Sequence, residues 1–203
     1  MKKVFVYTFG CKVNIYESEV IKDIFLKEGY DIAKSASAAD VIVINTCTVT
    51  EKADSKFLHL LKKVRAENPS AVIVSVGCYT QLESENEVLK ADSNIILGVN
   101  NKYDIIEALN LFKGNSFVAV PENHDLDYAD HELRSFQDHT RAFLKVQDGC
   151  DNFCTYCTIK YARGNSRSRR KASVLSDVEY LSQKGFKEII LTGIDLGSYS
   201  DGE

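Results

Sequence analysis

The sequence predicts an α/β protein whose N-terminal part is an open parallel sheet with helices on both faces. Two observations support this fold class. Short runs rich in valine and isoleucine alternate with longer stretches in which apolar residues recur at helical spacing. Helices cover both faces of a parallel sheet, so its strands appear as continuous apolar runs. The alternation continues for about 110 residues, which is enough for one self-sufficient core.

Four strands and three helices are expected in this part. The strands are the apolar runs at residues 4–9, 41–45, 71–76 and 94–97. Apolar residues on one helical face mark the helices: Tyr16, Val20, Ile21, Ile24 and Phe25, then Phe57, Leu58, Leu61 and Val64, then Ile105, Ile106 and Leu109. The first helix is expected to end near Gly29. The second should end before Pro69, because a residue that precedes proline disfavours the helical conformation.

The rest of the chain divides into a linker and a second domain. Residues 113–139 break the alternation and include a polar, acidic stretch from residue 121 to 132, so they are predicted to be a linker after a domain of residues 1–112. Residues 140–203 contain a strand at 141–146, a helix at 173–184 and a strand at 188–192. These are the first βα units of an incomplete (β/α) barrel, because a full barrel needs roughly 200 residues or more. The chain is therefore expected to be a fragment.

Composition indicates a protein of the cytoplasm. The chain has six cysteines in 203 residues, no tryptophan and a formal net charge of −4. The first residues contain too few apolar side chains for a secretory signal, and no run approaches the ~18 residues of a membrane span. Without a secretory context, metal binding or catalysis is a commoner use of cysteines than disulfides. We therefore expect a cytoplasmic protein with no membrane partner.

Three cysteines lie in one short loop. Cys150, Cys154 and Cys157 have the spacing C-x3-C-x2-C, which can present three thiolates to one [4Fe–4S] cluster. Such a cluster normally takes four cysteine ligands, so one iron would stay open to a substrate or cofactor. Other interpretations explain the spacing less well. The neighbouring residues are poor helix formers, a disulfide leaves a cysteine over, and no cysteine or histidine follows Cys157 to complete a zinc site.

The other three cysteines each follow a predicted strand. Cys11, Cys47 and Cys78 come directly after such runs, although more than thirty residues separate neighbours. In an open parallel sheet, ligands bind outside the carboxyl ends of the strands, so the three thiols are expected to converge. A single cysteine is more often a small buried hydrophobe than a ligand, but the repetition favours a second cluster. Gly10 and Gly77 would let the backbone approach it closely.

The segments around both groups of cysteines resemble the radical S-adenosylmethionine (SAM) methylthiotransferases. The resemblance covers essentially the whole chain and is strongest to the bacterial branch that acts on N6-threonylcarbamoyladenosine in tRNA. It rests on five segments, at residues 10–14, 43–50, 77–79, 147–157 and 191–199. One departure is Lys160, which stands where relatives usually have proline and would leave the end of the loop less rigid.

The resemblance implies two [4Fe–4S] clusters with different tasks. The cluster on Cys150, Cys154 and Cys157 would bind SAM and, with an electron from a reductase or flavodoxin, generate the radical that takes hydrogen from C2 of the adenine. The cluster on Cys11, Cys47 and Cys78 would carry the sulfur, methylated by a second SAM. Isopentenyladenosine in tRNA and a ribosomal protein are alternative substrates. Alone, the chain should be inactive, because most of the barrel that excludes water is missing.

The resemblance also suggests contacts to SAM and RNA. Tyr156 would place its backbone against the adenine of SAM, and Thr192 and Gly193 would bind the methionyl amino group, although an ordinary turn is the alternative there. The one basic concentration contains Lys160, Arg163, Arg167, Arg169, Arg170 and Lys171. Such runs are often solvated faces, but here the four arginines would contact the phosphates of tRNA. Arg163 or a neighbour would pair with the carboxylate of the modified base.

Two other classes of protein stay open from the residues alone. One is a non-catalytic iron–sulfur module for electron transfer or sensing, and the other is a structural zinc protein.

Overall fold

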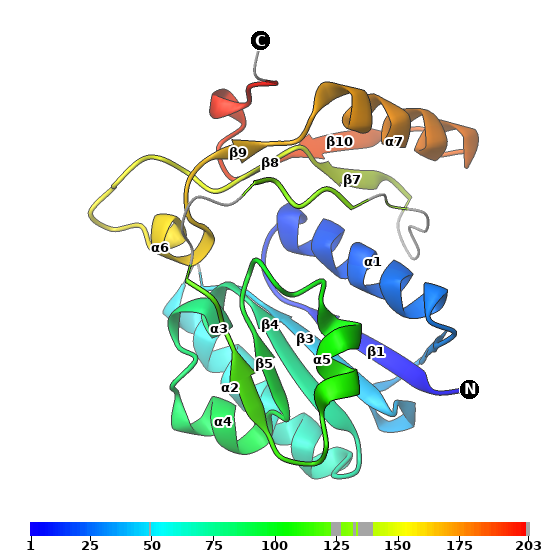
Figure 1. The fold of residues 1–203 in the computed structure, drawn as a ribbon, viewed down its shortest axis with the longest axis vertical. Helices are drawn as coiled ribbons and strands as arrows, with labels where there is room; N and C mark the ends of the chain where they lie inside the picture. The colour runs from blue at the N-terminus through cyan, green and yellow to red at the C-terminus, as the bar shows by residue number, and fades with distance from the viewer. Residues whose placement is uncertain (49, 123–126, 132, 134–139, 202–203) are drawn as a thin grey trace.

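A six-stranded parallel sheet forms the N-terminal part of the computed structural model, which describes residues 1–48, 50–122, 127–131, 133 and 140–201 (Figure 1). The strands are β1 (Lys3–Thr8), β2 (Asp31–Ile32), β3 (Val41–Thr46), β4 (Val72–Gly77), β5 (Ile95–Leu97) and β6 (Phe117–Ala119). Their order is β2-β1-β3-β4-β5-β6, and every neighbouring pair is parallel. The predicted fold class is confirmed for this part.

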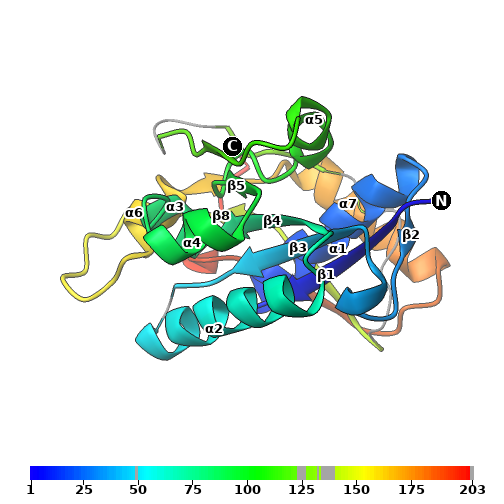
Figure 2. The ribbon, with the colours of Figure 1, turned by 90° about the horizontal axis from the view of Figure 1, so that it is seen from below.

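Helices cover both faces of the sheet. They are α1 (Lys12–Lys27), α2 (Glu51–Glu67), α3 (Cys78–Leu82), α4 (Glu87–Asp92) and α5 (Ile105–Leu111), with a 3-10 turn η1 (Ala36–Ala38). Strand β3 shows how its sequence serves both faces, because successive side chains of a strand point in opposite directions. Val41 and Val43 pack into the core under α1 and α5, whereas Ile42 and Ile44 pack into the core under α2 and α4 (Figure 2).

Local signals set the ends of the longest helix, α2. The hydroxyl of Thr50 accepts a hydrogen bond from the backbone N–H of Ala53, which caps the first turn. Phe57, Leu61 and Val64 recur at helical spacing and are all at most 1% exposed. The helix ends at Glu67, before Asn68 and Pro69, as the sequence predicted.

The second unit contains one βαβ motif. Strands β7 (Ala142–Lys145) and β10 (Ile189–Thr192) pair in parallel and are connected through α7 (Lys171–Gln183). The short strands β8 (Gln147–Asp148) and β9 (Arg167–Ser168) pair antiparallel beside them, with α6 (Ile159–Arg163) between and η2 (Leu196–Ser198) at the end. Leu144 and Val146 share one core with Tyr16 and Val20 of α1, so α1 lies between the sheet and the second unit (Figure 1).

The predicted linker is more structured than expected. Strand β6 lies in it and forms an edge of the N-terminal sheet. Further on, the Tyr128 hydroxyl donates to the Lys145 carbonyl at 2.8 Å, and Asp130 pairs with Arg169 at 2.6 Å. Residues 123–126, 132 and 134–139 of the linker lie outside the described residues. The described parts therefore pack against both units instead of only connecting them.

No helix among the described residues is both long and apolar enough to cross a membrane.

Candidate functional site

The structure places three cysteines at the carboxyl ends of three adjacent strands. Cys11 follows β1 and caps α1, Cys47 follows β3, and Cys78 follows β4 as the first residue of α3. Because β1, β3 and β4 are parallel neighbours, their carboxyl ends meet at one edge. Cys47 and Cys78 are buried, at 4% and 1% exposure, whereas Cys11 is exposed. We call Cys11, Cys47 and Cys78 the strand-end cysteines.

Two glycines let the loops around these cysteines come close together. Gly10 and Gly77 have φ of +108° and +114°, a region that favours glycine. A Cβ added at Gly10 would lie 2.8 Å from the Cys47 sulfur, and one at Gly77 would lie 2.5 Å from the Thr46 carbonyl oxygen. Both glycines thus let neighbouring strand-end loops pack closely, while their predicted role in the approach to a cluster stays a prediction.

Two buried asparagines connect the first two loops. Asn14 donates to the carbonyl of Thr46 at 2.9 Å, and Asn45 donates to the carbonyl of Asn14 at 3.1 Å. The Cys11 thiol donates to the Asn14 side chain at 3.3 Å. Sequence reasoning did not assign these asparagines a role. The available signal was polar residues beside cysteines, one of them inside an apolar strand.

The loop with Cys150, Cys154 and Cys157 follows β8 and lies largely in solvent. We call these three the loop cysteines. The Cys157 backbone N–H donates to the Cys154 carbonyl at 3.0 Å, which forms a tight turn. Phe153 and Tyr156, between the cysteines, are 72% and 89% exposed. The loop therefore presents two aromatic side chains to whatever approaches the thiols.

Gln147 fixes the base of this loop. Its side-chain nitrogen donates to the Gly149 carbonyl at 2.8 Å, and its side-chain oxygen accepts from the Asp195 backbone at 2.7 Å. The segment after β10 therefore lies against the start of the loop, and it contains Thr192 and Gly193. A Cβ at Gly193 would be 2.9 Å from that of Gln147. The two predicted SAM-binding residues thus lie near the loop base, and their role stays a prediction.

Lys160, the predicted departure from the family pattern, contacts residues at both ends of the loop. Its ammonium group lies 3.1 Å from the Asp151 carboxylate and 5.0 Å from the centre of the Phe153 ring. It also donates to the side chain of Asn165. Side-chain contacts therefore restrain the loop at a position where the fixed φ of proline would otherwise do so.

A group of buried charged residues lies between the N-terminal sheet and the second unit. We call it the buried charge cluster, and its members are Glu17, Lys102, Lys145, Asp148, Arg163 and Arg167. One carboxylate oxygen of Glu17 lies 2.6 Å from Lys102, 3.2 Å from Lys145 and 2.9 Å from Arg163. Asp148 lies 3.0 Å from Lys145, 2.9 Å from Arg163 and 3.4 Å from Arg167. Four cations thus surround two carboxylates.

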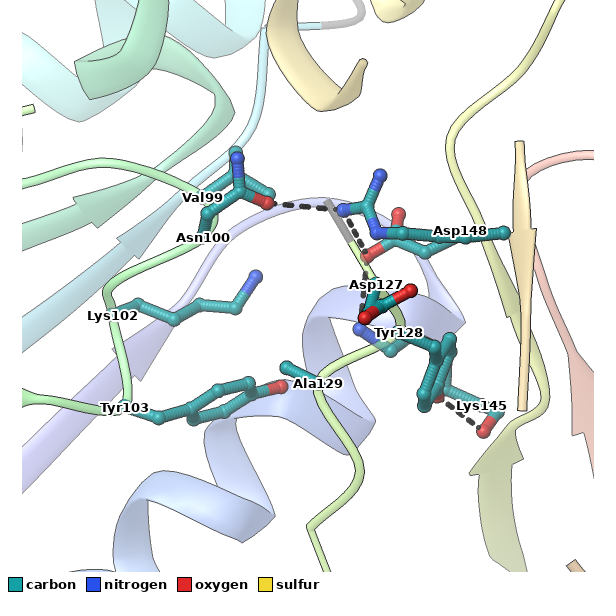
Figure 3. A pocket seen from close by; sticks show the side chains of 10 residues that line it. Val99, Asn100, Lys102, Tyr103, Asp127, Tyr128, Ala129, Lys145 and Asp148 are labelled. Atoms are coloured by element: carbon teal, nitrogen blue, oxygen red, sulfur yellow. Dashed lines mark hydrogen bonds and ion pairs between the residues drawn. The ribbon is translucent and has the colours of Figure 1, made fainter. Parts of the chain in front are cut away.

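Part of the cluster lines a cavity of about 140 Å³. Lys102, Lys145 and Asp148 form its polar wall, and the rings of Tyr103 and Tyr128 contribute to the rest. Figure 3 shows the ammonium group of Lys102 directed into this space. Arg167 and Asp127 line it as well, so the cavity has a wall of mixed charge.

Burial and ion pairing shift the pKa values of the charged groups in this cluster in opposite directions. Burial disfavours the charged form of Glu17, but Arg163, Lys102 and Lys145 hold its pKa below the usual range. Burial likewise acts against the charge on Asp148, and Lys145 with the two arginines keeps its pKa well below normal. At Lys102 burial prevails over the pull of Glu17 and lowers the pKa to about 8. Lys102 is thus the cation that the cluster compensates least.

The arginines predicted to contact RNA are not all on the surface. Arg163 and Arg169 are each 1% exposed. Arg163 belongs to the buried charge cluster, and Arg169 pairs with Asp130 at 2.6 Å and Asp177 at 2.8 Å. Both guanidinium groups therefore form ion pairs inside the protein with carboxylates of other elements. Arg167 is 11% exposed at its side chain and pairs with Asp148, whereas Arg170 is exposed, and contact of these arginines with RNA stays a prediction.

The donors present suit an iron–sulfur cluster. Within the described ranges, no three histidine, cysteine or acidic side chains stand close enough to hold one metal ion. In a four-iron cluster each thiolate binds a different iron, so its ligands stand further apart than those of a single ion. Each group offers three thiols, the soft ligands that such clusters select. All six cysteines therefore remain predicted ligands.

Comparison with known families identifies the N-terminal part. Residues 3–98 match the sequence model of a family described as uncharacterized protein family UPF0004. The matched segment is slightly less than half of the 203 residues. The UPF0004 domain runs from β1 to β5 and includes all three strand-end cysteines. The matched segment therefore contains the whole strand-end site.

Similarity to individual proteins continues beyond the UPF0004 domain. Threonylcarbamoyladenosine tRNA methylthiotransferase MtaB of Thermotoga maritima is 41% identical over 201 residues, covering 98% of this chain and 45% of the relative. The protein of the same name from Bacillus subtilis is 36% identical over 204 residues (99% and 45%). The tRNA-2-methylthio-N(6)-dimethylallyladenosine synthase of Halalkalibacterium halodurans is 33% identical over 205 residues (98% and 38%). The chain is a homologue of tRNA methylthiotransferases, as its motifs predicted, and spans less than half the length of these three.

Gly77→Ala tests the close approach of the strand ends. We expect it to lower the free energy of unfolding by about 1–3 kcal/mol more than Gly114→Ala. Both glycines have positive φ, +114° and +99°, but only at Gly77 would the new Cβ collide with backbone. Urea denaturation followed by circular dichroism gives the comparison. Equal losses in the two variants would contradict the tight packing around Cys78.

Glu17→Gln tests the buried charge cluster. At pH 7 we expect a loss of about 3–5 kcal/mol in the free energy of unfolding, because buried cations lose their shared partner. The pKa of Glu17 is lower in the folded protein than in the unfolded chain. Its contribution is therefore present above about pH 4.3 and is lost as the pH falls. The difference in the free energy of unfolding between Glu17→Gln and the wild type should therefore become smaller as the pH falls.

The matched control is Glu188→Gln. Glu188 forms an exposed pair with Arg141 at 3.3 Å, and such pairs contribute little. Urea denaturation of the three proteins from pH 7 to pH 3 makes the comparison. A Glu17 variant as stable as the Glu188 variant at pH 7 would disprove the role assigned to the cluster.

Proposed function

We propose that the whole protein is a radical SAM methylthiotransferase that adds a methylthio group to C2 of N6-threonylcarbamoyladenosine beside the anticodon of tRNA. The observation that carries this proposal is the similarity to proteins of that name over 98% and 99% of the chain. The presence of two groups of three cysteines, the strand-end cysteines and the loop cysteines, in one chain supports it. Because the chain spans less than half of those relatives, the activity is proposed for the whole protein, and the chain alone should be inactive.

The two groups of cysteines would hold two [4Fe–4S] clusters. When bound, these clusters and SAM would supply the electron transfer, the radical and the sulfur for the reaction. The chain's own residues would position them. Gln147 orients the start of the loop, while Thr192, Gly193 and the backbone of Tyr156 would contact SAM. Gly10 and Gly77 keep the strand-end loops close enough for three thiolates to share a cluster.

Recognition of tRNA would use the exposed part of the basic stretch. Arg170 is exposed, so its guanidinium group can reach phosphate oxygens. The carboxylate of the modified base needs a cationic partner once it leaves water. Arg163 is too deeply buried for that contact and Arg167 is engaged by internal partners, so the exposed Arg170 is the better candidate. A cytoplasmic location and an electron-donating reductase or flavodoxin complete the proposal.

A second candidate substrate is isopentenyladenosine in tRNA. It is favoured by the similarity to a dimethylallyladenosine synthase, at 33% identity over 205 residues. The similarity to the threonylcarbamoyladenosine enzymes is higher, at 41% and 36%. The two bases differ in a charged carboxylate, so one experiment separates them.

Deletion of the gene for the whole protein tests the substrate. We expect the 2-methylthio form of threonylcarbamoyladenosine to disappear from total tRNA and its unthiolated precursor to accumulate. Mass spectrometry of nucleosides from the deletion strain and from a complemented strain makes the measurement. Loss of methylthio-isopentenyladenosine instead would keep the reaction class and overturn the substrate. No change in either nucleoside would leave a ribosomal protein or a non-catalytic role.

Anaerobic reconstitution of this chain tests the cofactors. We expect about eight iron and eight sulfide ions per chain, as two four-iron clusters. Replacing all three loop cysteines by alanine should leave about four of each, and replacing all three strand-end cysteines should do the same. Zinc in place of iron, or a variant that keeps both clusters, would show that the ligands are wrongly assigned.

A further inference from the structure

Arg163 lies at the end of a short helix that packs against the helix of one strand-end cysteine. Helix α6, which ends at Arg163, packs against α3, which begins at Cys78. Cys78 forms a small buried cluster with Ala162, the neighbour of Arg163, and with Val99. Cys78 and Arg163 are both 1% exposed. Cys78 at the start of α3 and Arg163 at the end of α6 thus lie in the same buried region.

One nitrogen of Arg163 has no hydrogen-bond partner. Its two terminal nitrogens donate to Glu17 at 2.9 Å and 3.3 Å, and one of them donates to Asp148 at 2.9 Å. Its Nε is buried and, within the described residues, makes no hydrogen bond. A buried donor left unpaired costs free energy, so a partner is expected at that position in the working protein. Nε is the one nitrogen of this guanidinium group that neither carboxylate reaches.

The surrounding charge also calls for an anion. Four cations share two carboxylates in the buried charge cluster, and an excess of buried positive charge is costly unless something compensates it. A sulfur at Cys78 that carries negative charge would compensate the excess and give Nε an acceptor.

We propose that Arg163 is a positioning residue for the Cys78 sulfur, which it holds by a charge-assisted hydrogen bond from Nε when that sulfur ligates the strand-end cluster. The inference rests on the proposed function, because it needs a cluster at that site. Hydrogen bonds and positive charge near cysteine sulfurs raise the reduction potential of iron–sulfur clusters. Arg163 therefore makes the strand-end cluster easier to reduce.

Arg163 also connects the two groups of cysteines. It stands at the end of the helix that follows the loop cysteines, and its partner Asp148 lies just before them. Its other partner, Glu17, lies on the helix that Cys11 caps. A change in the loop is thus transmitted through one side chain to the sulfur of Cys78.

The test is the potential of the strand-end cluster alone. In the reconstituted chain with Cys150→Ala, Cys154→Ala and Cys157→Ala, Arg163→Gln should lower the equilibrium constant for one-electron reduction about tenfold. That change is a shift of about 59 mV to lower potential. Spectroelectrochemical titration measures it, and circular dichroism confirms that each variant is folded.

Three further variants distinguish an effect of the Arg163 charge on the reduction potential from an effect of a damaged fold. Glu17→Gln disturbs the same cluster but removes a negative charge, so its shift should have the opposite sign. Arg170→Gln removes a charge from an exposed arginine in the same stretch and should give no shift. Arg163→Lys keeps the charge without Nε and should give a smaller shift than Arg163→Gln, which keeps the test open if glutamine impairs folding.

The outcomes separate this inference from the proposed function. If the loop-cysteine variant binds no iron, the cluster assignment fails and the inference fails with it. If the cluster forms and Arg163→Gln leaves its potential unchanged, only the inference is overturned. Shifts of the same sign in Arg163→Gln and Glu17→Gln would also overturn it, because they would indicate a general loosening of the site.

Discussion

One carboxylate, that of Glu17, determines how the two parts of the chain meet. It is completely buried and contacts cations from three other segments: Lys102 after β5, Lys145 in β7 and Arg163 in α6. An isolated charge at this depth would be strongly unfavourable, so each of these segments must be in place for the arrangement to be stable. The position of the second unit on α1 follows from that requirement as much as from apolar packing. The geometry between the two groups of cysteines depends on it in turn.

The elements that the sequence predicted are those whose signal is local. Strands β1, β3 and β4 are continuous apolar runs, and the cysteines that follow them needed only the rule that parallel strands end at one edge. The loop cysteines were recognisable from their spacing alone. In contrast, β2 and β6 have two and three residues, too few for any periodicity to show. Segment 113–139 therefore resembled a linker although part of it belongs to the sheet.

The role of Arg163 could not have been found in the same way. Its basic neighbours indicated an RNA-binding surface, yet its partner Glu17 is 146 positions away in the sequence. Pairing over such a separation follows from the fold, and a charge run gives no information about it. Asn14 and Asn45 are similar, because their hydrogen bonds connect loops that only the sheet brings together. Polar residues inside otherwise apolar segments were the one visible sign.

Helix α1 has a further consequence, since it contributes side chains to both parts of the molecule. Tyr16 and Val20 pack in one core with strand residues of the sheet and with Leu144 and Val146 of the second unit. Unfolding of either part would expose the same apolar surface of α1, and its cost would be shared between them. The two units should therefore melt in one cooperative transition. The change in composition along the sequence therefore does not mark a boundary between two parts that unfold independently.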